Sequence, residues 1–98
     1  MSDADRQSAR WMQREDDRIL EFLREEGLAT HRLISREVFE SISPGTVAER
    51  LSMLEYAGLV CCGPGWESYE LTEEGQMYLD GDLDARHQPT PTVDRVLR

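Results

Sequence analysis

The stretch SPGTVAERLSMLEYAGLV, residues 43–60, carries the strongest structural signals in the chain. Ser43 is a good helix N-cap, and Pro44 suits the first helical position because it needs no amide donor there and already holds a helical φ. Gly58 can end the helix. The apolar positions between these signals recur at helical spacing and are Val47, Leu51 and Leu54. The stretch therefore predicts an amphipathic helix over 44–57, with its apolar edge turned inward.

Two further helices are predicted before this stretch. Apolar residues at helical spacing predict the first over 11–26, with Gly27 as its stop. Thr30 is a good N-cap for a short second helix over 31–38. A tight connection with an apolar residue inside it then leads into the third helix.

After the third helix, the sequence predicts a β-hairpin and a fourth helix. LVCC (59–62) and YEL (69–71) are typical of its two strands, and Gly-Pro-Gly (63–65) is typical of a turn. The hairpin with its tip covers 59–72. Thr72 then caps a short helix with two acidic residues in its first turn, where the helix dipole favours them.

Length leaves room for one domain. The 98 residues match a single small domain. We expect a polar N-terminal arm over 1–10, the domain over 11–84 and a flexible tail over 85–98, which has prolines and no core-forming pattern. An alternative for the tail is that three apolar residues dock as one helical turn: Val93, Val96 and Leu97.

The charge pattern is unusual. The chain has 11 basic residues, all of them Arg, and 20 acidic residues, for a formal net charge of −9. An acidic surface without Lys is typical of proteins in a cytoplasm of molar salt, where self-repulsion is screened. A GC-rich genome is the alternative, since it also replaces Lys by Arg. No apolar run approaches the roughly 20 residues of a membrane span, and the N-terminus lacks an apolar signal core, so we expect a soluble cytoplasmic protein.

The order of helix, helix, tight turn, helix, hairpin and helix is that of a winged helix-turn-helix domain. Residues 43–60 resemble the recognition helix and first wing strand of that superfamily, and YELTEEG (69–75) resembles its second wing strand and the following helix start. RWMQREDDRILEFLREEG (10–27) is similar to the haloarchaeal phage-repressor-like transcription regulators. The resemblance covers about residues 11–84. It implies a mainly α fold with a small β-hairpin (α+β), and repression by sequence-specific binding to double-stranded DNA, usually as a dimer.

Helical geometry predicts which face of the third helix meets the major groove. Gly45 lets the backbone approach closely, the hydroxyls of Ser43 and Thr46 can bond phosphate or base, and the helix N-terminus attracts phosphate. Arg50, at the margin of this face, could reach phosphate or guanine. With the preceding helix and the wing, the candidate DNA-binding residues are His31, Arg32, Arg36, Ser43, Gly45, Thr46, Glu49, Arg50, Ser52, Met53, Trp66 and Ser68.

Several of these residues have a second interpretation. Arg32 and Arg36 either position phosphates or pair with acidic neighbours on the helix surface. Glu49 either accepts from cytosine or stays solvated. The wing tip, 63–68, has no cation, whereas wings in the minor groove generally use Arg or Lys, and Trp66 could pack instead of touching DNA. The alternative function is a winged-helix adaptor or anti-repressor that binds proteins and has lost DNA binding.

Dimerisation is expected from the geometry of a palindromic operator. Two recognition helices must read half-sites about 34 Å apart, so something must join two copies of the chain. The apolar residues that one small domain leaves over form the candidate homodimer interface: Trp11, Met12, Met77, Tyr78 and Leu83.

No pattern of catalytic or metal-ligating residues stands out, so we expect neither an enzyme nor a cofactor. The sequence also gives no reason to infer a small-molecule ligand. The neighbours Cys61 and Cys62 fit two small hydrophobes in a strand, with redox sensing as the alternative.

Overall fold

The helices and strands follow one another in the predicted order, with additions at three places. The computed structural model describes residues 6–63, 65 and 67–96. Its elements are α1 (Arg14–Glu26), β1 (Leu28–Thr30), α2 (His31–Val38), α3 (Pro44–Tyr56), β2 (Val60–Cys62), β3 (Ser68–Leu71), α4 (Glu73–Leu79), the 3₁₀ turn η3 (Ala85–His87) and α5 (Val93–Val96). Among the described residues, no helix has the length and apolar character needed to cross a membrane.

Side-chain caps set the starts of three helices as the sequence predicts. Thr30, Ser43 and Thr72 each accept a hydrogen bond from the backbone N–H three residues later, at 3.1, 3.2 and 3.0 Å. Each bond satisfies a donor that the first helical turn would otherwise leave without a partner. The predicted bounds of α2 are confirmed, and α3 ends one residue earlier than expected.

The first helix begins later than predicted. Its first residue is Arg14, not Trp11, because the backbone N–H of Gln13 donates to the Asp16 carboxylate at 3.0 Å and caps the helix there. Trp11 and Met12 precede the helix and pack against the core as partly buried side chains.

The sheet has three strands, one more than the predicted hairpin. The antiparallel order is β1-β3-β2, with Ala29 and Cys62 both opposite Tyr69. The added strand, β1, is only three residues long and lies between the Gly27 stop and the Thr30 cap. Three residues are too few to show the alternation of apolar and polar side chains by which a strand is predicted. The segment is a strand only because it pairs with β3.

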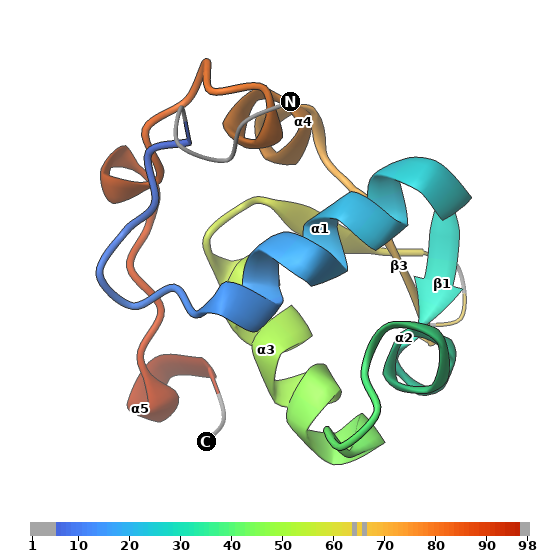
Figure 1. Ribbon diagram of the computed structural model, residues 1–98. Coiled ribbons are helices and arrows are strands. Elements are labelled where there is room, and N and C mark those ends of the chain that lie inside the picture. Colours follow the sequence, from blue (N-terminus) through green and yellow to red (C-terminus); the bar gives the residue numbers. More distant parts are fainter. Residues whose placement is uncertain (1–5, 64, 66, 97–98) are drawn as a thin grey trace.

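The core lies between the three-helix unit and the sheet (Figure 1). In this view α1 crosses the middle of the molecule, with α3 below it and α2 beside β1. The apolar edge predicted for α3 is confirmed, because Val47, Leu51 and Leu54 are at most 1% exposed. The fold is therefore the winged helix-turn-helix that the sequence predicts.

Part of the C-terminal segment, for which the sequence predicted a flexible tail over 85–98, contacts the domain. Ala85 is buried and donates from its backbone N–H to the Gln7 carbonyl at 2.9 Å. The Gln88 amide donates to the Ala57 carbonyl at 2.9 Å. Figure 1 shows the N-terminal and C-terminal segments running side by side. Helix α5 forms one helical turn beside α3, but its Val93 is 64% exposed and none of its residues is buried. Leu97, the third residue of the docked alternative, lies outside the described residues.

Tyr78 belongs to the core and not to a dimer surface. Its side chain is fully buried, and its hydroxyl donates to the Asp17 carboxylate at 2.7 Å. Burial, and then the bond to Asp17, raise the pKa of Tyr78 above its ordinary value. Helix α4 is thereby tied to α1.

This hydrogen bond predicts a loss of stability in alkaline solution. The unfolded chain releases the Tyr78 proton near pH 10, while the folded chain keeps it, so stability should fall as pH rises above about 10. Tyr78→Phe should reduce that slope and cost about 1.5–3 kcal/mol at pH 7, as expected for a bond to a charged acceptor. Urea unfolding at pH 7 and pH 11 measures both effects, and Tyr56→Phe, on the surface, is the control. An unchanged alkaline slope in Tyr78→Phe would contradict this account.

Candidate nucleic-acid interface

The N-terminal half of α3 presents an open, polar face. Ser43, Gly45, Thr46 and Glu49 are all exposed. The Ser43 hydroxyl accepts from the Thr46 N–H and donates to the Thr46 hydroxyl, both at 3.2 Å. Added atoms at Gly45 would meet nothing closer than the Ser43 hydroxyl at 3.8 Å, so the backbone here is accessible to a large partner.

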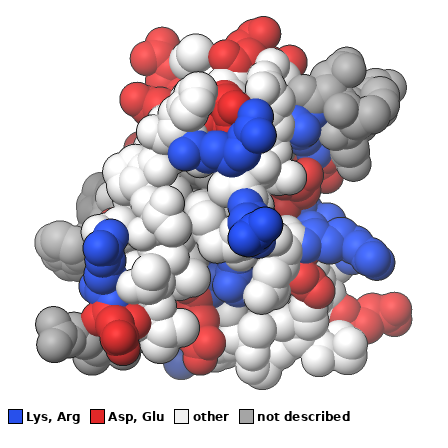
Figure 2. Space-filling view, turned by 90° about the vertical axis from the view of Figure 1, so that its left-hand side faces the viewer, with Lys and Arg blue, Asp and Glu red and all other residues white. Residues whose placement is uncertain are grey.

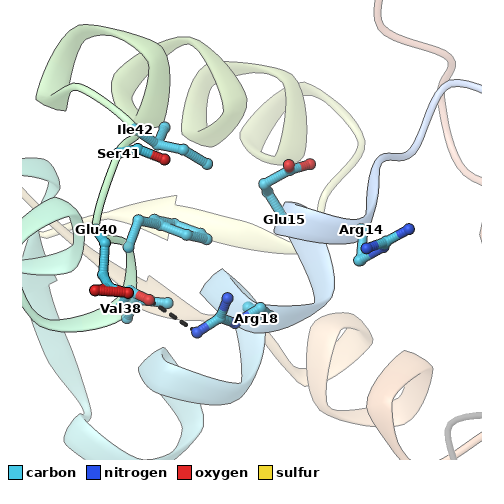
Figure 3. Close-up of a pocket in the computed structure, with 8 residues that line it drawn as sticks. Arg14, Glu15, Arg18, Val38, Glu40, Ser41 and Ile42 are labelled. Atoms are coloured by element: carbon cyan, nitrogen blue, oxygen red, sulfur yellow. Dashed lines mark hydrogen bonds between the residues drawn. The ribbon is translucent and has the colours of Figure 1, made fainter.

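The turn before α3 is held from two sides. Inside, the buried hydroxyl of Ser35 donates to the Ile42 carbonyl at 2.7 Å. Outside, the Arg18 guanidinium donates to the Val38 carbonyl at 2.8 Å and lies over the Phe39 ring at 5.2 Å. Figure 3 shows Arg18 reaching from α1 to Val38 across a cavity of about 310 Å³. These contacts fix the angle between α2 and α3.

Arg50 anchors α3 to α1 and is not a free cation of the exposed face. Its guanidinium donates to both carboxylate oxygens of Asp16, at 2.9 and 2.7 Å, and to the Trp11 carbonyl at 3.3 Å. The Asp16 side chain is 0% exposed and that of Arg50 is 12% exposed. The hydrogen bond to Asp16 raises the pKa of Arg50. The prediction that Arg50 lies available to DNA is therefore corrected, because a buried carboxylate holds it.

Met53 also does not lie on the outer face. Its side chain is 8% exposed, whereas helical geometry predicted an outward position. The prediction assumed one buried edge, but α1, α2, β2 and α5 all pack against α3. Ser52, near α5, is half-buried, and Tyr56 is exposed.

The cations of α2 remain exposed. Arg32 is exposed, and the Arg36 side chain is 74% exposed with Glu37 at 3.4 Å from its Nε. Such an exposed pair is weak, so the guanidinium is available to another anion. His31, the first residue of α2, is half-buried. Because α2 packs against α3, these side chains belong to the same unit as the open face.

The wing brings hydroxyl and amide groups but no cation. Ser68 is half-buried, and its carbonyl accepts from the Gly63 N–H at 2.7 Å. Trp66, the other wing candidate, lies outside the described residues. The thiols of Cys61 and Cys62 are half-buried, and burial raises the pKa of both, which disfavours the reactive thiolate.

The apolar residues predicted for a dimer do not form one exposed patch. Tyr78 is in the core, as described above. Trp11, Met12 and Leu83 are partly buried against the core, and Met77 is 39% exposed. The domain thus covers more of its apolar surface than the sequence suggested.

Sequence reasoning missed the residues that position α3. Asp16 and Arg50 are 34 positions apart, and Arg18 and Val38 are 20 apart. The one signal was the place of Asp16 within the apolar stripe of α1, where a carboxylate needs a buried partner.

One solved structure links this geometry to a known protein. The PhiH1 repressor-like protein from Haloarcula marismortui is 36% identical, with a TM-score of 0.79, over 88% of this chain and 97% of that chain. No protein-family model matches the chain, and no relative was found among curated proteins.

Proposed function

The chain belongs to the PhiH1 repressor-like family, and from this premise we propose that it represses transcription by sequence-specific binding to double-stranded DNA. The observation that carries the proposal is the exposed start of α3, held rigidly by Ser35, Arg18 and the Asp16–Arg50 pair. A rigid helix with a polar, sterically open N-terminal face is what the major groove accepts.

In the proposed complex, α3 reads bases and α2 positions the backbone. Ser43, Gly45 and Thr46 enter the groove first, with Glu49 and Ser52 further along. Three side chains of α2 contact phosphates: His31, Arg32 and Arg36. Such contacts set the position of the protein along the duplex but do not distinguish one base sequence from another. Arg50 and Met53 support the helix from inside and are not part of this interface.

The acidic composition sets the conditions for binding. With a net charge of −9, the chain should bind DNA poorly in dilute salt and rely on base-edge contacts in molar KCl. We propose a halophilic regulator in the cytoplasm, acting as a homodimer on a palindromic operator. Its affinity should depend weakly on salt, with fewer than about five apparent phosphate contacts.

A protein-binding adaptor is the second candidate. Glu49 is exposed on the face of α3 that would meet DNA, the charge of Arg50 is paired with that of Asp16, and the wing tip has no cation. Each of these features removes attraction to a polyanion.

Selection of bound fragments from random duplex DNA in molar KCl tests the proposal. We expect one enriched, two-fold symmetric sequence. Arg36→Gln should weaken binding to all sequences alike, whereas Thr46→Ala should weaken binding to the selected sequence about tenfold and change the preferred bases. The matched control is Arg24→Gln, because the Arg24 guanidinium pairs with Asp80, the C-cap residue of α4.

Two results would count against parts of this proposal. No enrichment at any KCl concentration would favour the adaptor. Equal losses in Arg36→Gln and Arg24→Gln would mean that α2 does not face the duplex. Sedimentation at micromolar concentration decides the dimer separately, because a monomer that still binds a single half-site leaves α3 as the reader.

A further inference from the structure

A cavity lies between the two segments that flank the domain. It is lined by three residues of the N-terminal segment and two of the C-terminal segment: Ala9, Arg10, Trp11, Arg86 and Thr90. Its volume is about 410 Å³, which falls within the range of small-molecule sites.

The walls of this cavity are built by specific contacts. Gln7 and Asp84 form a parallel bridge, and the next N–H, of Ala85, donates to the Gln7 carbonyl at 2.9 Å. The Gln88 amide ties the C-terminal segment to the end of α3 through the Ala57 carbonyl. The cavity is therefore part of the packed structure.

The lining combines an aromatic surface with positive charge. Arg86 is neutralised by Asp84 at 2.7 Å, but Arg10 is exposed and has no ion-pair partner among the described residues. Figure 2 views the side of the molecule on which the two segments lie, and it shows Arg side chains spread over a mostly uncharged surface, with acidic side chains beside some of them and along the edges. In a chain of net charge −9, this local balance favours a small anion.

The Trp11 indole adds a second, independent observation. Within the described part of the chain its N–H is buried and has no hydrogen-bond partner. Buried donors are almost always paired, so an unpaired one points to an acceptor that the described residues do not supply. Trp11 therefore both lines the cavity and carries a buried N–H donor without a partner among the described residues.

Trp11 connects this cavity to the recognition helix. The Arg50 guanidinium lies over the Trp11 ring at 5.9 Å and donates to the Trp11 carbonyl at 3.3 Å. Arg50 belongs to α3 and is paired with Asp16. A molecule that shifts Trp11 therefore acts on the contact that anchors α3.

We propose that this cavity is an effector site for a small aromatic carboxylate, whose carboxylate pairs with Arg10 and, once Trp11 shifts, accepts from the Trp11 N–H. A planar guanidinium matches a carboxylate with two parallel hydrogen bonds, and the apolar wall takes the ring. Occupancy moves Trp11 and Arg50 and so changes DNA affinity. This last step rests on the proposed function, whereas the site itself does not.

Fluorescence titration with phenylacetate in molar KCl tests the site. Trp66→Phe leaves Trp11 as the only tryptophan, so its emission reports the cavity directly. We expect saturable binding below about 1 mM, and binding about tenfold weaker for the neutral phenylacetamide, which corresponds to losing about 1.4 kcal/mol of charge-assisted bonding. Arg10→Gln should remove the preference for the acid, and Arg95→Gln, outside the cavity, should keep it.

Thr90→Trp checks the location, because the exposed Thr90 can accept a large side chain that fills the cavity without entering the core. Calorimetric titration of this folded variant, verified by circular dichroism, should show no binding of phenylacetate. Equal binding of acid and amide, unchanged binding in Thr90→Trp, or no saturable signal in the parent would overturn the site.

The regulatory step is measured separately, on the selected DNA. Saturating phenylacetate should change DNA affinity at least threefold in the parent and leave it unchanged in Arg10→Gln. Unchanged affinity in the parent would overturn the coupling and leave the site standing. If the protein binds no DNA even without phenylacetate, the proposed function fails, while the fluorescence titration still decides the site.

Discussion

Asp16→Ala should lower the free energy of unfolding by about 3–5 kcal/mol, the range for breaking a buried ion pair from one side. The carboxylate is fully buried and accepts three hydrogen bonds, two from Arg50 and one from the Gln13 N–H. Its removal leaves the Arg50 charge unpaired near the core and the start of α1 without its cap. Both losses act on the contact between α1 and α3.

Urea unfolding at one fixed KCl concentration measures this effect. Glu15→Ala, next along α1 and only half-buried, is the control and should cost under about 0.5 kcal/mol. Removing both charges in Asp16→Leu/Arg50→Met should cost less than Asp16→Ala alone, because apolar groups of similar size can replace a buried pair. A loss below about 1 kcal/mol in Asp16→Ala would show that the pair does not anchor α3.

Gly75→Ala should cost about 3 kcal/mol or more, at or above the upper end of ordinary overpacking. An added Cβ at this position in α4 would collide with the Leu59 carbonyl oxygen and lie 2.6 Å from Cδ1 of Leu71. The Leu59 carbonyl cannot move away easily, because it accepts from the Thr72 N–H at 3.1 Å; Leu59 directly precedes β2 and Thr72 directly precedes α4. The close approach of α4 to the sheet therefore requires glycine here.

Gly45→Ala provides the matched substitution on α3. Its Cβ would meet only the Ser43 hydroxyl, at 3.8 Å, so stability should stay equal or rise slightly through helix propensity. Thermal unfolding of both variants compares them directly. A fully stable Gly75→Ala protein would mean that α4 can move away from the sheet, and the packing described here would be wrong. If α3 reads DNA, Gly45→Ala should bind it less well although it folds normally.

The residues that hold α3 in place differ from the residues that we propose contact DNA. Asp16, Arg50, Ser35 and Arg18 act on the position of α3, and changing any of them should alter DNA binding through stability or helix angle. Thr46 and Arg36 stand on the surface, and their replacement should leave stability nearly unchanged. Measuring unfolding beside DNA affinity distinguishes the two groups.

The sequence by itself determined the local structure. Helix starts follow from side chains that bond amides three residues away, and helix stops follow from glycine, so Ser43, Thr72 and Gly27 can be interpreted without the rest of the fold. The same local rules predicted the buried edge of α3 and the exposed Gly45 and Thr46. The composition alone gives the strongly negative net charge of the protein.

Only the tertiary structure decided which polar groups pair across the fold. Arg50 was predicted to be available because helical periodicity places it beside the exposed face, but Asp16, distant in sequence, captures it. Met53, Tyr78 and Ala85 are buried because other elements pack over them. Periodicity describes one helix against one partner, whereas burial and charge pairing depend on everything that packs around it. For that reason the anchoring of α3, and the cavity beside Trp11, appear only once the chain is folded.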